Sequence, residues 1–226
     1  MKKIGIVVAV EFPTVLKITD AIDKIEKKSC YKILKIVHND IEFIFLESGP
    51  GEIQAGAATQ FLIDNYKPDC IVNLGFAGGL TSKLKVGDLC LVENVVHTDY
   101  DVSQINRDIH PGQYPGLTDE KIRLDKKLID EMKKTSLLTM VSCASQDKII
   151  IGDQMRQVLA EQWQCDICDM ELAGICIIAL KNKVPLASLK VVSDTVGDRT
   201  DSIDFSNEIF EEKLRALLAL LWTCEN

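Results

Sequence analysis

The amino-acid sequence predicts an α/β fold, a layered domain built around a largely parallel sheet. Short runs rich in Val, Ile and Leu alternate along the chain with segments of helical periodicity, and this alternation is typical of strand–helix–strand units. No internal repeat, low-complexity tract or long linker interrupts the pattern, and 226 residues fit one domain. We therefore expect a single domain over residues 1–226.

The expected strands are short runs of branched apolar residues. Several, such as Lys3–Val10, are apolar at nearly every position, which is typical of strands that helices cover on both faces. The expected strands are Lys3–Val10, Ile33–Val37, Glu42–Glu47, Cys70–Leu74, Asp88–Val96, Leu138–Cys143 and Leu186–Val192.

The expected helices lie between and after these strands. The last one has apolar residues at the spacing of one helical face, namely Ile209, Phe210, Leu214, Leu217, Leu218 and Leu221. The expected helices are Thr14–Lys27, Ile53–Asn65, Lys126–Lys134, Asp153–Gln162, Glu171–Lys181 and Ser206–Leu221. The segment from His97 to Leu117 has no clear periodicity, and a loop of this length is usually a lid or an interface.

The acidic balance of the chain limits its partners. The formal net charge is −8, whereas nucleic acids and anionic membranes favour a basic surface. Glu11 interrupts the N-terminal apolar run, which therefore indicates a strand rather than a signal peptide, and no apolar stretch reaches the roughly 18 residues that span a bilayer. We expect a cytoplasmic protein that binds neither nucleic acid nor membrane.

Most of the eight cysteines lie inside apolar runs, where a free thiol packs as a small hydrophobic group. Cys165 and Cys168 form a Cys-x-x-Cys pair, but no second pair or histidine pair accompanies it. Gln54 stands where a dinucleotide fingerprint needs its third glycine, and no P-loop or Gly-x-Ser-x-Gly motif is present. We expect no metal and no cofactor.

Carboxylates remain as the candidate chemistry, since three of them stand at the ends of predicted elements. Glu11 follows the first strand, Asp194 follows the last one, and Glu171 begins the helix before it. Ligands of open α/β sheets bind beyond the carboxyl ends of the strands. Each carboxylate alone fits an ordinary turn or helix start, but together they indicate acid–base chemistry without a metal.

The segments around these residues resemble a known family in their order and spacing. They are Ser48–Gly51 with the Ala- and Gly-rich helix after it, Asn73–Leu80, Leu84–Asp88, Asp169–Glu171 and Val191–Asp194. The chain resembles the nucleoside phosphorylase/nucleosidase superfamily, and most of all the 5′-methylthioadenosine/S-adenosylhomocysteine nucleosidases. This resemblance runs from Ile4 to the C-terminal helix. It implies a three-layer α/β/α domain with a mixed, mostly parallel central sheet.

The resemblance also implies catalytic and sugar-binding roles. Glu171 would bind ribose hydroxyls, with Met170 packed under the sugar, and Asp194 would donate a proton to purine N7 beside Ser193. These roles suit the reaction, because breaking the N-glycosidic bond builds positive charge on the ribose and negative charge on the base.

Further residues are assigned to the base and to a second subunit by the same resemblance. Backbone groups of Ile150 would meet adenine, Ile149 would pack against its face, and Phe205 would close over it. The segment Gly112–Gly116 resembles a loop that relatives lend to a neighbouring subunit. The implied partners are a purine nucleoside and a second copy of the chain.

Water is the expected nucleophile. Phosphorolysis needs a site for a phosphate dianion, which relatives build largely from arginines in the N-terminal half, but the first arginine here is Arg107. Asn73 stands where phosphorylases carry an arginine. The residues around the water also depart from the nucleosidase pattern: Pro13 replaces a glutamate, Phe76 a serine and Lys190 an arginine.

The identity of the base that activates water is therefore open. Glu11 takes that role if the turn after the first strand is shorter by two residues. Phe76 would reshape the ribose end if the protein is a glycosidase for another nucleoside. Three functions remain: a hydrolase that releases adenine from methylthioadenosine-type nucleosides, a related glycosidase or phosphorylase for another nucleoside, and a protein that binds nucleosides without cutting them.

Overall fold

The computed structural model describes residues 1–134, 137–197 and 208–223. Its strands are β1 (Lys2–Val8), β2 (Glu26–Lys28), β3 (Tyr31–His38), β4 (Ile41–Glu47), β5 (Cys70–Gly79), β6 (Leu89–His97), β7 (Ile122–Arg123), β8 (Thr139–Ser145), β9 (Ile167–Asp169) and β10 (Leu186–Asp194). Its α-helices are α1 (Phe12–Ile18), α2 (Glu52–Tyr66), α3 (Lys126–Met132), α4 (Asp153–Trp163), α5 (Leu172–Asn182) and α6 (Glu208–Trp222).

All of these strands belong to one mixed sheet, ordered β10-β6-β8-β9-β5-β1-β4-β3-β2, with β7 beside β6. The ladders from β10 through β5 and β1 to β4 are parallel, whereas β10 meets β6, and β5 meets β9, in antiparallel pairs. Because β10 also pairs with β5, the strands β5, β10, β6, β8 and β9 close into a ring. The α/β class and the mixed sheet are as expected from the sequence.

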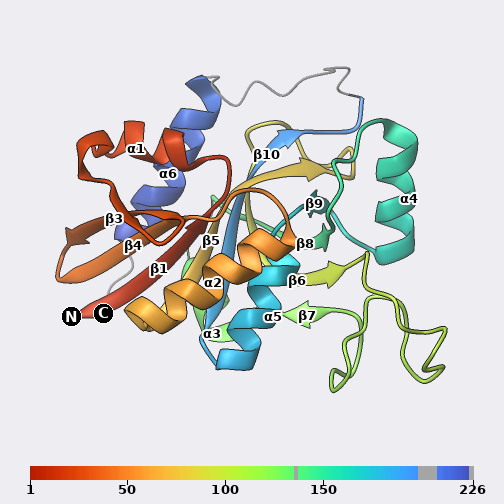
Figure 1. Ribbon diagram of the computed structural model, residues 1–226. Coiled ribbons are helices and arrows are strands. Elements are labelled where there is room, and N and C mark those ends of the chain that lie inside the picture. The colour runs from red at the N-terminus through yellow and green to blue at the C-terminus, as the bar shows by residue number, and fades with distance from the viewer. Residues whose placement is uncertain (135–136, 198–207, 224–226) are drawn as a thin grey trace.

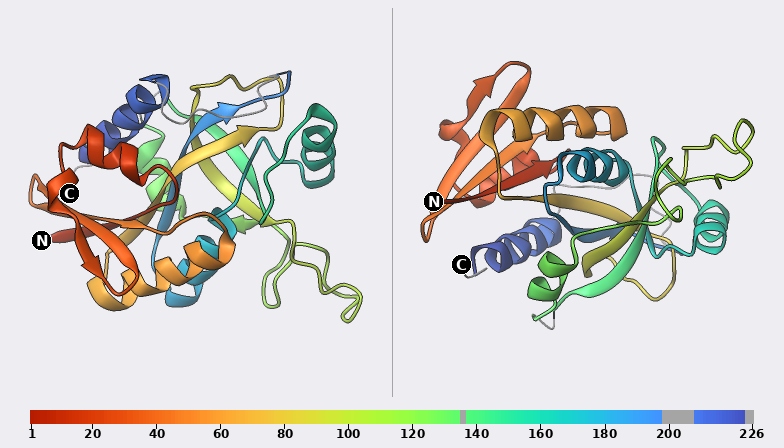
Figure 2. Two further views of the ribbon diagram at one scale, coloured as in Figure 1. Left: turned by 45° about the horizontal axis from the view of Figure 1, so that its top comes forward. Right: turned by 90° about the horizontal axis from the view of Figure 1, so that it is seen from below.

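Helices cover this sheet on both faces, as the apolar strands require. Helices α2 and α5 lie side by side on one face, and α3 and α6 lie on the other (Figure 2). The contact between α2 and α5 is close because Gly174 has no side chain, and a Cβ there would run into the backbone oxygen of Glu52. On the second face, α1 packs against α6, and Lys17 pairs with Glu211 at 2.5 Å.

The expected helix over Thr14–Lys27 is wrong in its second half. Helix α1 ends at Ile18, where the Thr19 hydroxyl donates back to the backbone oxygen of Val15 and Asp20 adopts a left-handed conformation at φ 49°. The charged residues that follow form β2, which pairs antiparallel with β3. A local side-chain bond and a positive φ therefore stop a helix that the apolar spacing alone would continue.

Two other differences concern the neighbourhood of the site. Strand β5 continues through Gly75–Gly79, beyond the end expected at Leu74, and the three-residue β9 was missed because it is too short to show a period. The segment between β6 and β7 is a loop of turns, as expected, and it projects from the body of the protein (Figure 1). Tyr100 and Tyr114 stack within it, with ring centroids 4.0 Å apart.

No α-helix in the three described ranges is both long and apolar enough to cross a membrane.

Candidate active site at the strand ends

Glu11 occupies the turn after β1 and points into the protein. Its Oε1 accepts a hydrogen bond of 2.6 Å from the backbone N–H of Phe76, while its buried Oε2 has no hydrogen-bond partner among the described residues. Glycine is required at position 75, because a Cβ there would lie 2.9 Å from Oε1. Pro13 is exposed in the first turn of α1. The short turn therefore directs Glu11, and not residue 13, toward the strand ends.

Glu171 lies at the N-terminus of α5, as its N-cap residue. Its Oε1 accepts a hydrogen bond of 3.0 Å from the backbone N–H of Gly51, in the turn before α2. Burial raises the pKa of Glu171 to about 7, and the charge of Asp169 adds to the effect while Lys190 opposes it. Burial likewise raises the pKa of Glu11, against the opposing charge of Lys190.

Lys190 brings these carboxylates together from the middle of β10. Its side chain is buried, with the residue 1% exposed, and Nζ lies 2.7 Å from Asp169 Oδ2. Burial opposes its charged form, but Asp169 and Glu171 more than offset this and raise the pKa of Lys190. The ammonium group therefore stays charged, and it acts on both Glu171 and Glu11.

Asp169 is linked through Ser145 to a second buried carboxyl group, that of Glu52. Ser145 Oγ lies 2.5 Å from Asp169 Oδ1, contacts Glu52 Oε1, and accepts a hydrogen bond from the backbone N–H of Ala173. A serine hydroxyl carries one hydrogen, so it cannot donate to both carboxyl groups. Burial and the charge of Asp169 raise the pKa of Glu52 to about 8. At neutral pH, Glu52 is protonated and donates to Ser145, which in turn donates to Asp169.

Asp194 ends β10 on the other side of the site. Ser193 Oγ lies 2.6 Å from Asp194 Oδ1, and the guanidinium of Arg156 contacts Asp194 Oδ2 through Nη2. Arg156 comes from α4, which stands beside the end of β10 (Figure 1). Both carboxylate oxygens of Asp194 therefore have side-chain partners.

The remaining residues predicted for the site differ in how deeply they are buried. Ile150 is buried against the small core under α4, and Phe76 is buried with its ring 5.0 Å from that of Phe210. Met170 is half-buried beside Glu171. Ile149, by contrast, is 70% exposed. Phe205 lies outside the described residues.

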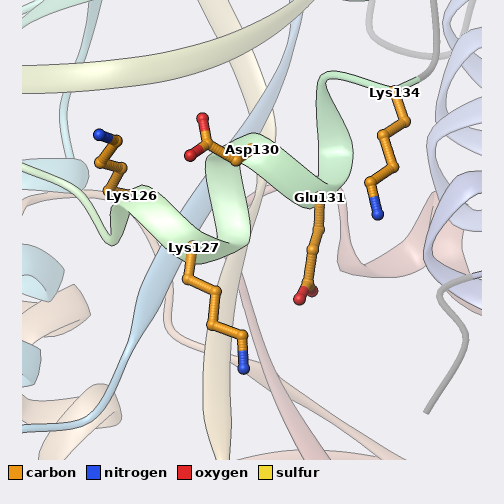
Figure 3. A pocket seen from close by; sticks show the side chains of 5 residues that line it. All are labelled: Lys126, Lys127, Asp130, Glu131 and Lys134. Carbon is orange, nitrogen blue, oxygen red and sulfur yellow. The ribbon is translucent and has the colours of Figure 1, made fainter.

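A surface hollow over α3 is unrelated to this cluster. It is lined by Lys126, Lys127, Asp130 and Glu131 from α3 and by Lys134 from the turn after it (Figure 3). Helix α3 lies at the start of β10, where Asp125 N–H donates to the Leu186 oxygen, and a nine-residue strand places Asp194 about 26 Å away. The charged side chains there form an ordinary solvated face.

The match of the chain to a family model covers almost the whole sequence. The model describes the phosphorylase superfamily, and it matches residues 3–224, including every residue discussed above. The chain belongs to the phosphorylase superfamily. This superfamily contains the nucleoside phosphorylases and nucleosidases, which cleave N-glycosidic bonds.

Named superfamily members resemble the chain in sequence and in fold. A 5′-methylthioadenosine/S-adenosylhomocysteine nucleosidase of Buchnera aphidicola is 31% identical over 192 residues, which are 82% of this chain and 81% of the relative. The same type of nucleosidase from Campylobacter jejuni has a TM-score of 0.87 at 20% identity, covering 99% of this chain and 98% of its own.

Two Helicobacter pylori superfamily structures also share the fold. A futalosine hydrolase mutant has a TM-score of 0.81 at 21% identity, covering 98% of this chain and 97% of its own. A mutant methylthioadenosine nucleosidase, with 5′-methylthioadenosine in its active site, has a TM-score of 0.83 at 23% identity and covers 98% of this chain and 96% of its own. Purine nucleosides are therefore ligands of proteins with this fold.

The sequence indicated the carboxylates of this superfamily member but missed the residues that hold them. Arg156, Glu52 and Ser145 received no role, although one signal for Arg156 was present. Arg156 shares a helical face with Leu159 and Trp163, at spacings of three and seven residues, so an inward-facing charge was predictable. No sequence signal placed Glu52 and Ser145 beside Asp169, because they come from separate elements.

Proposed function

We propose that the protein is a purine nucleosidase that hydrolyses the N-glycosidic bond of 5′-substituted ribonucleosides of the methylthioadenosine and S-adenosylhomocysteine type. The reaction releases the free base and the ribose derivative, with water as the nucleophile. One observation carries the proposal: Glu11 has a buried, unpartnered carboxylate oxygen among the other charged groups at the strand ends. An unpaired buried acceptor is costly unless a ligand or water occupies it.

Glu11 is the proposed base. A water held by its Oε2 attacks C1′ of the ribose as the C1′–N9 bond breaks, and the carboxylate takes the proton that the water loses. The raised pKa of Glu11 favours this role, since a base acts best when its pKa is near the working pH. The hydrogen bond from Phe76 holds the other oxygen in place.

Glu171 is the proposed ribose ligand, and Asp194 the proposed acid. Glu171 accepts one backbone hydrogen bond at each oxygen, from Gly51 N–H at Oε1 and from Met170 N–H at Oε2. The remaining lone pairs of the carboxylate are available to the 2′- and 3′-hydroxyls. Its charge also stabilises the positive ribose in the transition state. Asp194 takes a proton from solvent and passes it to N7. This proton neutralises the negative charge that the purine gains when the electron pair of the C1′–N9 bond moves onto it.

The charge at the ribose end supports water over phosphate. Glu11, Asp169 and Glu171 lie together there. Among the described residues, the cation beside them is Lys190, and it already pairs with Asp169. A phosphate dianion would face these carboxylates without an arginine fork to bind it. Phosphorolysis is therefore the weaker alternative.

A homodimer is the proposed assembly. The loop between β6 and β7 exposes Ile105, which is 92% accessible in the single chain, and exposed apolar residues on a projecting loop favour burial against a partner. Light scattering on the purified protein tests this proposal, and a monomer mass would contradict it.

The decisive experiment is chromatography of nucleosides incubated with the protein, each with and without phosphate. The nucleosides are 5′-methylthioadenosine, S-adenosylhomocysteine, adenosine and inosine. We expect the free base to appear without phosphate, and fastest from a substrate with a 5′ substituent. Release that requires phosphate would establish a phosphorylase, and binding without release would indicate a nucleoside-binding protein.

A further inference from the structure

Arg156 is a buried charged residue of the candidate site, and it has no role in the proposed reaction. The residue is 6% exposed, and its guanidinium makes three contacts. Nη1 donates to the Gly79 oxygen at 2.8 Å, and Nη2 donates both to the Ile150 oxygen at 3.3 Å and to Asp194 Oδ2. The guanidinium therefore bridges Asp194 and the backbone of Ile150.

This bridge lies where the base would bind, provided that the proposed function holds. In that function Asp194 meets purine N7, and the resemblance described above places backbone groups of Ile150 against the base. A group that touches both of them lies beside N7, on the edge where a purine also carries its C6 substituent. The Ile150 carbonyl, the acceptor that a 6-amino group would need, already receives a hydrogen bond from Arg156.

We propose that Arg156 makes the site selective for 6-oxopurines, as in inosine-type nucleosides, over 6-aminopurines. N7 and O6 of a 6-oxopurine are neighbouring acceptors. Asp194 meets N7, and Nη2 of Arg156, which already contacts Asp194, donates to O6 beside it. The amino group of a 6-aminopurine would instead point its own hydrogens at this donor. This inference rests on the proposed function for the orientation of the base, and it changes the adenine expected from the sequence.

The contacts of Arg156 suit an exchange of partners when a base enters. The 3.3 Å bond to Ile150 is the longest of the three, so O6 can replace it at little cost. The bond to Gly79 keeps the guanidinium in place, and Ser193 still donates to Asp194 Oδ1. The new hydrogen bond to O6 stabilises the negative charge that develops on the leaving base.

Matched pairs of nucleosides test the inference. The rates of base release from inosine and adenosine, and from 5′-methylthioinosine and 5′-methylthioadenosine, give the ratio of kcat/KM for the two bases. We expect the wild type to favour the 6-oxopurine by at least about 10²-fold, since sites whose buried polar groups lose their partners can reject the wrong ligand by up to roughly 10⁴–10⁵-fold. Equal values of kcat/KM, or a preference for adenine, would overturn the inference.

Two variants locate the effect at Arg156. Arg156→Gln offers an amide oxygen that accepts a hydrogen bond from the 6-amino group, so we expect the ratio to shift toward adenine. Arg156→Lys keeps the charge but loses the fork, so we expect a weaker 6-oxopurine preference. Arg123→Gln, at an exposed arginine on β7, serves as the control and keeps the wild-type ratio. An unchanged ratio in Arg156→Gln, with the fold intact by thermal denaturation, would also overturn the inference.

Binding of the free bases separates this inference from the proposed function. Calorimetry with hypoxanthine and adenine measures base recognition without any cleavage. Hypoxanthine that binds at least tenfold more tightly than adenine supports the role of Arg156 even if no nucleoside is hydrolysed, in which case only the proposed function fails. Equal binding, or no binding of hypoxanthine, contradicts the inference.

Discussion

The two ends of the candidate site differ in how their carboxylates are partnered. At the ribose end, Glu11 keeps one buried oxygen without a partner, and burial raises the pKa of both Glu11 and Glu171. At the base end, Ser193 and Arg156 contact both oxygens of Asp194. The ribose end is therefore ready to accept hydrogen bonds, whereas the base end must exchange a contact when a ligand binds.

Because of this difference, we expect the ribose end to determine the rate of the reaction and the base end to determine which base is bound. Unpartnered acceptors with raised pKa values serve a substrate that donates hydrogen bonds, as water and sugar hydroxyls do. A charge that already has partners discriminates between ligands, because each ligand must match what it replaces. Substitutions at the ribose end should therefore affect the rate, and substitutions at the base end should also affect which base is cut.

The largest effect is expected for Glu11→Gln. The amide cannot take a proton from water, so kcat should fall by about 10³-fold, within the range for a lost general base. Steady-state hydrolysis without phosphate measures the change, with Glu131→Gln on the exposed face of α3 as the control. A rate within threefold of wild type would remove Glu11 from the mechanism.

Asp194→Asn should lower kcat by about 10²-fold. The loss is smaller than at Glu11, because Arg156 remains to stabilise the charge of the leaving base. The same assay measures it, together with thermal denaturation to establish that the fold persists. Near-normal turnover would exclude Asp194 as the acid.

Glu171→Gln should remove most of the preference for ribosides over 2′-deoxyribosides. Replacing the charged acceptor weakens the hydrogen bonds to the ribose hydroxyls, and we expect the kcat/KM ratio of the two substrates to fall about tenfold. Competition between a riboside and its 2′-deoxy form gives this ratio directly. If it stays at the wild-type value, Glu171 does not bind the 2′-hydroxyl.

The pH dependence of hydrolysis should reflect the ribose end. Glu171, with a pKa raised to about 7, and Glu11, with a raised pKa, must both be ionised to act. We therefore expect kcat/KM to rise by about tenfold between pH 6 and pH 8. A profile that is flat over this interval would contradict ionisation of these groups as a requirement.

The smallest effect is expected for Glu52→Gln, and it concerns stability. Burial raises the pKa of Glu52 to about 8 from 4.5, so the folded protein holds an extra proton between these values. Its contribution is complete below pH 4.5 and is lost as the pH rises through 8. Glutamine has no charge to bury, so the fall in Tm from pH 5 to pH 9 should be about 2–4 °C smaller in the variant. An equal fall in both proteins would contradict a protonated Glu52.

The sequence was sufficient for the alternation of strands and helices and for placing Glu11, Glu171 and Asp194 at the ends of elements, because each depends on neighbouring residues. It failed where a contact between distant segments decides the structure. Strand β9 forms because β5 and β8 supply its hydrogen bonds, and Asp194 meets Arg156 across 38 residues. The residues that hold a carboxylate in place are less predictable than the carboxylate itself.

The exposed position of Pro13 has a consequence for the classification of related sequences. When the chain is aligned with nucleosidases without gaps, Pro13 stands at the position of their water-activating glutamate. A proline at this position would suggest that the chain is inactive. The turn after β1 instead presents Glu11 to the interior. Divergent homologues with a proline at this position should therefore be inspected two positions upstream before they are set aside as pseudoenzymes.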